Sequence, residues 1–110
     1  SRIIPVVGDL SQPLLGLSEA QFFALAKKLD VIYHNGAWVH HASPYSTLKA
    51  ANVLGTQEVL RLASQIKIKP VHFISTISVF SAPTGTGVQL IREQSSLDDY
   101  PVPEDGYAQS

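Results

Sequence analysis

The sequence lacks cysteine and methionine among its 110 residues, and its charge is almost balanced, with a net value of -1. The lack of cysteine excludes disulfide bonds and cysteine-ligated metal, and it is typical of a cytoplasmic protein. The small net charge gives no electrostatic attraction towards nucleic acid or an anionic membrane surface. No apolar run reaches the roughly 18 residues that cross a bilayer, and no secretory signal pattern occurs. We therefore expect a cytoplasmic chain that binds neither nucleic acid nor membrane.

The absence of methionine, and so of a start residue, also indicates a segment of a longer protein. The chain opens at Ser1 directly before an apolar run, and it closes at Ser110, just inside a pattern that starts a helix. We therefore interpret residues 1–110 as an excised segment of one domain, with room for a modest core.

Short apolar runs alternate with helical patterns along the chain. Strands are predicted at residues 3–7, 31–34 and 71–75, with helices at 19–29 and 45–66 between them. Ser18 and Gln21 form a capping box before the first helix. Residues 81–105 are rich in glycine, proline and serine and predict a surface loop, after which Tyr107 opens another helix. This order predicts an α/β fold with a parallel sheet and crossover helices.

Polar residues stand where the predicted strands end. Asp9 follows the first strand, Asn35 the second, and Ser75 and Thr76 the third. In parallel sheets the binding site lies at the carboxyl ends of the strands. We therefore expect a functional site at this edge.

Three sequence segments carry a family resemblance. They are residues 6–17 (VVGDLSQPLLGL), residues 34–63 (HNGAWV, then PY, then NVLGT and EVLRLA) and residues 73–79 (FISTISV) with Tyr107. The chain resembles the extended short-chain dehydrogenase/reductase superfamily. Within it, the combination of HNGA and PY is similar to the thioester reductase domains that end nonribosomal peptide synthetases and carboxylic acid reductases.

The resemblance implies a Rossmann-type, doubly wound parallel sheet of which residues 1–110 are the central segment. The first βαβ unit, with its glycine-rich turn, would precede the chain, and the substrate-binding portion would follow it. The implied parent is an NAD(P)H-dependent oxidoreductase that uses NADPH to reduce an acyl or peptidyl thioester to an aldehyde or alcohol. Its partner would be a carrier domain that presents the thioester on phosphopantetheine. Without the glycine-rich turn and the catalytic lysine, which would follow Ser110, we expect the chain alone to be inactive.

The resemblance also assigns catalytic roles. Tyr107 matches the general acid, whose phenol needs a neighbouring lysine to bring its pKa from about 10 towards neutrality. Thr76 matches the hydroxyl that binds the substrate carbonyl, and strand alternation favours it over Ser75. Asn52 matches a residue that supports a proton relay to the lysine. The alternatives are a surface tyrosine, hydroxyls that only cap a turn, and a helical asparagine that faces solvent.

The cofactor side involves other residues. The resemblance implies that Asp9 accepts a hydrogen bond from the adenine amino group and that Leu10 covers the ring. It further implies that the adenosine-side wall contains Asn35, Gly36 and Ala37, and Ser75 is assigned to cofactor binding with them. The alternatives are an ordinary turn aspartate and a plain Asn-Gly turn.

Two other functions are compatible with the sequence. One is that of another extended member of the superfamily, such as a nucleotide-sugar epimerase, a dehydratase or a fatty acyl-CoA reductase. A non-catalytic dinucleotide-binding module is the second alternative. We expect no metal site at His34, His40 and His41, because adjacent histidines diverge and no carboxylate has ligand spacing to them.

Overall fold

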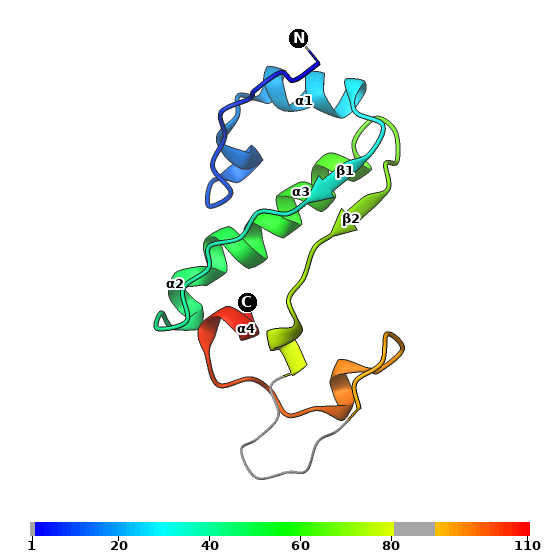
Figure 1. The fold of residues 1–110 in the computed structure, drawn as a ribbon. Helices are drawn as coiled ribbons and strands as arrows, with labels where there is room; N and C mark the ends of the chain where they lie inside the picture. The colour runs from blue at the N-terminus through cyan, green and yellow to red at the C-terminus, as the bar shows by residue number, and fades with distance from the viewer. Residues whose placement is uncertain (1, 81–89) are drawn as a thin grey trace.

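The fold is α/β and is built around one pair of parallel strands (Figure 1). The computed structural model describes residues 2–80 and 90–110. Strand β1 (Ile32–His34) pairs with strand β2 (Val71–Phe73), and the register places Tyr33 opposite His72. A long helical segment connects the two strands, as a crossover between parallel strands requires. The predicted α/β class and parallel pairing are therefore confirmed.

The strand predicted at residues 3–7 is absent from the sheet, which holds two strands in the part of the chain that the structure describes. Ile3 and Val7 are 80% and 93% exposed. An apolar run becomes a strand only when a neighbouring edge supplies hydrogen-bonding partners, and neither β1 nor β2 does so here. The prediction of three strands is therefore wrong for the described residues. The third predicted strand is also shorter than residues 71–75, since β2 ends at Phe73.

Helix α1 (Glu19–Lys28) begins at the predicted capping box. The Ser18 hydroxyl accepts a hydrogen bond from the Gln21 backbone nitrogen at 3.2 Å, and the Gln21 side chain accepts one from the Ser18 nitrogen at 3.1 Å. Phe22 and Ala26 on this helix pack with Leu62 to form the core. This burial holds α1 against the crossover helix.

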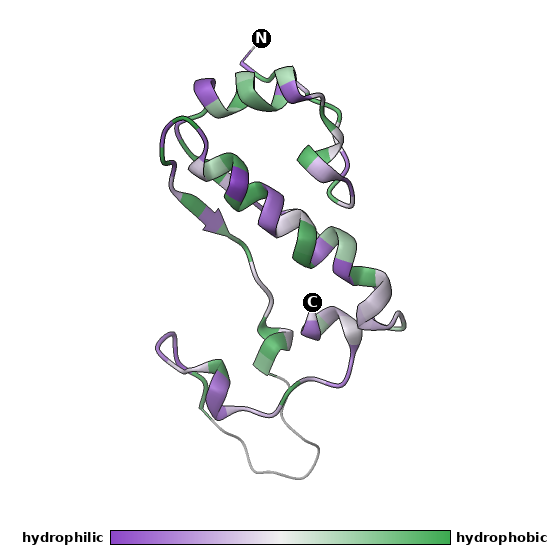
Figure 2. Cartoon of the chain, turned by 180° about the vertical axis from the view of Figure 1, so that it is seen from behind, coloured by the Kyte–Doolittle hydropathy of each residue, from purple (hydrophilic) through white to green (hydrophobic). Residues whose placement is uncertain are grey.

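The predicted helix at residues 45–66 forms in three parts. Helix α2 (Tyr45–Lys49) continues into a π-helical segment (Ala50–Leu54) and then into α3 (Gly55–Ser64). A Cβ atom on Gly55 would lie 2.6 Å from the Leu10 carbonyl oxygen, so glycine is required for this contact. The backbone of the crossover helix therefore lies directly against the Leu10 backbone at this point. Figure 2 shows apolar and polar residues alternating along α3, and its apolar residues Val59, Leu62 and Ala63 are buried.

The end of α3 is stabilised by the ammonium group of Lys69. Lys69 Nζ donates to the carbonyl oxygens of Lys67, Gln65 and Leu62 at 2.7, 2.8 and 3.3 Å. Ile66 in this turn has a φ of +62°, which is unfavourable for a β-branched residue. Burial lowers the pKa of Lys69 from its usual value. A single side chain therefore satisfies the carbonyl groups of a strained turn.

Replacing Lys69 with methionine is expected to lower the thermal midpoint of the protein by about 4–8 °C, because three carbonyl groups lose their donor. Lys67→Met is the matched control. Lys67 Nζ pairs with the exposed Asp30 carboxylate, and exposed ion pairs stabilise little. Differential scanning calorimetry of both variants checks the prediction, and equal shifts would contradict it.

The C-terminal part consists of short turns and one helical turn. Residues Ile77–Phe80 and Leu97–Asp99 form 3₁₀ turns, and α4 (Gly106–Gln109) begins where the sequence predicts that Tyr107 opens a helix. The Phe80 and Tyr100 rings meet edge to face at 5.1 Å. Of the predicted loop at 81–105, residues 81–89 lie outside the described residues. Among the described helices, none is long and apolar enough to cross a membrane.

Candidate functional site

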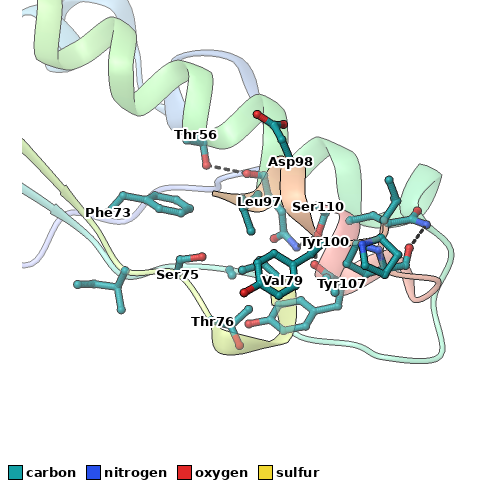
Figure 3. Close-up of a pocket in the computed structure, with 18 of the residues that line it drawn as sticks. Thr56, Phe73, Ser75, Thr76, Val79, Leu97, Asp98, Tyr100, Tyr107 and Ser110 are labelled. Atoms are coloured by element: carbon teal, nitrogen blue, oxygen red, sulfur yellow. Dashed lines mark hydrogen bonds between the residues drawn. The ribbon is translucent and has the colours of Figure 1, made fainter. Parts of the chain in front are cut away.

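A cavity of about 470 Å³ lies at the carboxyl ends of β1 and β2. Its wall contains the residues that follow both strands, the middle of the crossover helix, the stretch from residue 97 to 103, and α4. Figure 3 shows Thr56 and Phe73 towards one end of this space and Thr76 and Tyr107 towards the other. Six of the nine predicted site residues line it: Gly36, Ala37, Asn52, Ser75, Thr76 and Tyr107.

Tyr107 is held by the way α4 begins. Asp105 caps the helix, since its Oδ1 accepts a hydrogen bond from the Ala108 nitrogen at 3.0 Å. Gly106 is buried, and a Cβ atom there would overlap the Ser43 carbonyl oxygen and the Tyr45 nitrogen. The backbone of α4 therefore touches the backbone just before α2, and glycine permits this approach.

His41 also contacts this helix. Its ring meets the Tyr107 ring edge to face at 5.1 Å and 85°, and its Nδ1 lies 3.6 Å from Asp105 Oδ1. The sequence assigned no role to His41, and no spacing in it indicates the contact, because 66 positions separate the two rings along the chain. His41 thus packs against the ring expected to act as the acid.

Thr76 and Ser75 both line the cavity. Thr76 is half-buried, whereas Ser75 is exposed. Thr76 Oγ1 donates to Ser78 Oγ at 3.2 Å and accepts a hydrogen bond from the Ser78 nitrogen at 3.3 Å. The expectation that strand alternation turns Ser75 away is wrong, because β2 ends at Phe73 and alternation does not extend beyond it.

Asn52 is buried and makes three side-chain hydrogen bonds. Its Oδ1 accepts from the Trp38 nitrogen at 2.7 Å, while its Nδ2 donates to the Trp38 oxygen at 3.1 Å and to Ser110 Oγ at 2.8 Å. It lies within the π-helical segment, a feature often found at functional sites. The alternative of a solvent-facing asparagine is therefore excluded. Asn52 instead joins the stretch after β1 to the end of α4.

The other three predicted residues lie outside this cavity. Asp9 Oδ1 accepts two hydrogen bonds from Ser11, at 2.8 Å from its nitrogen and 2.7 Å from its hydroxyl. These bonds lower the pKa of the Asp9 carboxyl. Leu10 packs against Gly36 and Gly55, at both of which a Cβ atom would clash with it. Asn35 is exposed. The structure therefore places Asp9 in a turn, with its Oδ1 bonded to Ser11.

Sequence reasoning missed a further part of the wall. Several lining residues come from the stretch between residues 97 and 103, others come from the end of β2 and the segment after it, and one comes from α3: Leu97, Asp98, Tyr100, Pro101, Val102, Pro103, Phe73, Ile74, Val79 and Thr56. The prediction of a loop over the site is the only signal for the first group. The NVLGT motif contains Thr56, but nothing in that motif indicates its contacts.

The histidines considered above for a metal site, namely His34, His40 and His41, lie in separate environments. His34 is buried and its Nε2 lies 3.0 Å from Thr56 Oγ1, while His40 Nδ1 lies 2.8 Å from Ser43 Oγ. In residues 2–80 and 90–110, no three histidine or carboxylate side chains are grouped so as to hold a metal ion. The described site offers hydroxyl, phenol and amide groups and the Asp98 carboxylate around an otherwise largely apolar cavity.

Comparisons with known proteins agree on one family. The chain is 53% identical over 109 residues to a subunit of the linear gramicidin synthase of Brevibacillus parabrevis, a match that covers 99% of the chain and 2% of that protein. It is 41% identical to the aldehyde reductase lnaA of Aspergillus flavus, over 99% of the chain and 11% of that protein. The chain thus spans a small part of these relatives.

A solved structure is also similar. The crystal structure of the terminal R domain from the myxalamid PKS-NRPS biosynthetic pathway matches with a TM-score of 0.87 and 52% identity, over 98% of this chain and 27% of that one. The model of the NAD-binding family described as "Male sterility protein" (NAD_binding_4) matches residues 1–110. Since that match extends over the whole sequence, the chain belongs to this NAD-binding family.

Proposed function

We propose that the chain is the central part of a Rossmann-type, doubly wound reductase domain that reduces a carrier-bound acyl or peptidyl thioester to an aldehyde with NADPH. One observation carries the proposal: Thr76, Asn52 and Tyr107 come from three distant parts of the chain and line a single cavity. The names of the relatives support it, because they include a gramicidin synthase, an aldehyde reductase and a terminal R domain. Further reduction to an alcohol is compatible with the same residues.

The residues present fit part of a nicotinamide dinucleotide, the cofactor class that the family indicates. The cavity has the size of a small-molecule site. Gly36 and Ala37 line it, and Leu10 approaches Gly36 so closely that a Cβ atom there would lie 2.9 Å from Leu10 Cδ1. In this proposal the adenosine side of the cofactor is held by Asp9, Leu10, Asn35, Gly36 and Ala37, and Ser75 also binds the cofactor. When bound, the cofactor supplies the reducing equivalent.

Thr76 and Tyr107 interact with the carbonyl oxygen of the substrate. When substrate binds, the Thr76 hydroxyl turns from Ser78 Oγ, to which it donates in this structure, and donates to the thioester carbonyl oxygen instead. The negative charge on that oxygen grows during reduction. The Tyr107 phenol donates a proton to the same oxygen, which gives a hemithioacetal. The C–S bond of the hemithioacetal then breaks, so that the pantetheine thiol leaves and the aldehyde forms. Asn52 holds the Trp38 backbone and Ser110, which directly precedes the position where the resemblance expects a lysine. We propose a carrier domain with a phosphopantetheine-linked thioester as the partner.

Replacing Thr76 with valine in the full reductase domain, meaning the domain that contains this chain, tests the proposal. Valine keeps the shape of threonine and removes the hydroxyl, so the rate of aldehyde formation from an acyl-pantetheine thioester is expected to fall by about 100-fold. Thr76→Ser, which keeps the hydroxyl, is expected to stay within about fivefold of the wild type, since it loses only a methyl group, which contributes about 0.8 kcal/mol.

Aldehyde formation and NADPH oxidation are measured together in these variants. Equal rates for the valine and serine variants would remove Thr76 from this role. A wild-type domain that binds NADPH but forms no aldehyde from any acyl thioester would overturn the proposed reaction itself.

A further inference from the structure

A partly buried chain of hydrogen bonds leads from His34 to the wall of the cavity. His34 at the end of β1 is 6% exposed, and its Nε2 lies 3.0 Å from Thr56 Oγ1. Thr56 Oγ1 in turn donates to the Asn52 carbonyl oxygen at 2.6 Å. A hydroxyl has one proton, and here the Asn52 carbonyl receives it. His34 Nε2 must therefore be the donor in the first bond, which fixes the imidazole in the tautomer protonated at Nε2.

The environment favours the neutral form of this imidazole. The Phe73 ring packs against the His34 ring at 5.4 Å, and burial lowers the pKa of His34 from its usual value. Near neutral pH, His34 is thus an uncharged donor with one N–H aimed at Thr56. A buried donor with a single fixed partner defines the position of that partner.

Thr56 bonds an irregular part of the helix. The Thr56 hydroxyl bonds the carbonyl four residues earlier, an arrangement that competes with the regular helical ladder and bends helices. That carbonyl belongs to Asn52 inside the π-helical segment, where the Gly55 nitrogen bonds Ala50 five residues back. The same Asn52 directs its side chain to Trp38 and Ser110. The backbone oxygen of Asn52 therefore accepts a hydrogen bond from Thr56, while the side-chain amide of the same residue bonds Trp38 and Ser110.

We propose that His34 is a positioning residue: through the Thr56 hydroxyl it fixes the π-helical turn that aims the Asn52 amide at Trp38 and Ser110. This inference rests on the proposed function for its catalytic consequence, because Asn52 supports the end of α4. The bond from the Trp38 nitrogen to Asn52 gives a readout that needs neither substrate nor cofactor.

The test is a double-mutant cycle in the full reductase domain. His34→Phe keeps a ring and removes the donor, and Thr56→Val keeps the shape and removes the hydroxyl. Hydrogen exchange of the Trp38 amide, followed by mass spectrometry, is expected to accelerate by about fivefold or more in each, as for the loss of one hydrogen bond. Because both act through one pathway, the double variant is expected to match the larger single effect.

Conservative variants separate positioning from general damage. Thr56→Ser keeps the hydroxyl and His34→Gln keeps an N–H donor of similar reach, so both are expected to keep the wild-type exchange rate. The turnover number is expected to follow the exchange rate across the set, with the Kd for NADPH unchanged. Additive effects, or wild-type exchange in Thr56→Val, would overturn the inference. Thr56→Val is nearly isosteric and keeps the test decisive if His34→Phe does not fold.

The same set distinguishes the two proposals. Coupled changes in Trp38 exchange in a domain that reduces no thioester would support the positioning role of His34 and contradict the proposed reaction. Normal thioester reduction, together with additive effects of the two substitutions on Trp38 exchange, would support the proposed reaction and contradict the positioning role of His34.

Discussion

Replacing Tyr107 with phenylalanine in the full reductase domain is expected to reduce thioester reduction by about 1,000-fold, within the range for loss of a general acid. The change removes one oxygen and keeps the ring that His41 contacts at 5.1 Å. The cap from Asp105 to Ala108 involves only the Asp105 side chain and backbone, so α4 keeps its start. The Kd for NADPH is therefore expected to stay within about twofold, because a hydrogen bond not made to the cofactor contributes nothing to its binding.

Tyr100→Phe is the matched control for this prediction. Tyr100 is the other tyrosine among the described residues that line the cavity, and its ring packs against Phe80. Single-turnover rates and NADPH binding are measured for both variants. If Tyr100→Phe loses the activity and Tyr107→Phe keeps it, the acid has been assigned to the wrong tyrosine.

Replacing Gly106 with alanine is expected to reduce the same rate by about 100-fold, because a displacement of about 1 Å at a reacting group has an effect of this size. The added methyl group would overlap the Ser43 carbonyl oxygen and the Tyr45 nitrogen, which are backbone atoms and cannot rotate away. The start of α4 must then move, and Tyr107 moves with it.

Gln109→Ala provides a control on the same helix. This exposed side chain bonds the Pro103 carbonyl at 2.6 Å, on the stretch that leads into α4. Its loss is expected to change the rate by less than about fivefold, the effect of one exposed hydrogen bond. Circular dichroism and NADPH binding show whether Gly106→Ala remains folded. A folded Gly106→Ala variant with wild-type activity would contradict the close approach of the two backbones.

The sequence predicted those features that depend on local pattern. The capping box at Ser18 and the helix at Tyr107 are each encoded within a few neighbouring residues, and both are confirmed. The parallel pairing is also confirmed, and it follows from the alternation of strands and helices along the chain. The strand at residues 3–7 failed because a strand also needs a partner edge, which apolar periodicity does not report.

The site was predictable in outline only. Position at a strand end brought Thr76 and Gly36 to the same cavity, as parallel topology requires. The contact between His41 and Tyr107 depends on how α4 meets the backbone at Ser43, which is a property of tertiary packing. The side-chain hydrogen bonds of Asn52 likewise depend on a π-helical turn, which no residue pattern in the sequence indicates. Roles of these residues stay predictions until the variants are measured.

The anchoring of α4 has a consequence for how this family can vary. At its first residue the helix rests on Ser43, and at its end Asn52 bonds Ser110, so both supports belong to the first half of the chain. Among the described residues, the stretch from 90 to 102 is not one of these supports. Insertions or deletions in that stretch can therefore change the shape of the cavity wall while Tyr107 keeps its place. The shape of the cavity and the position of Tyr107 can then vary separately.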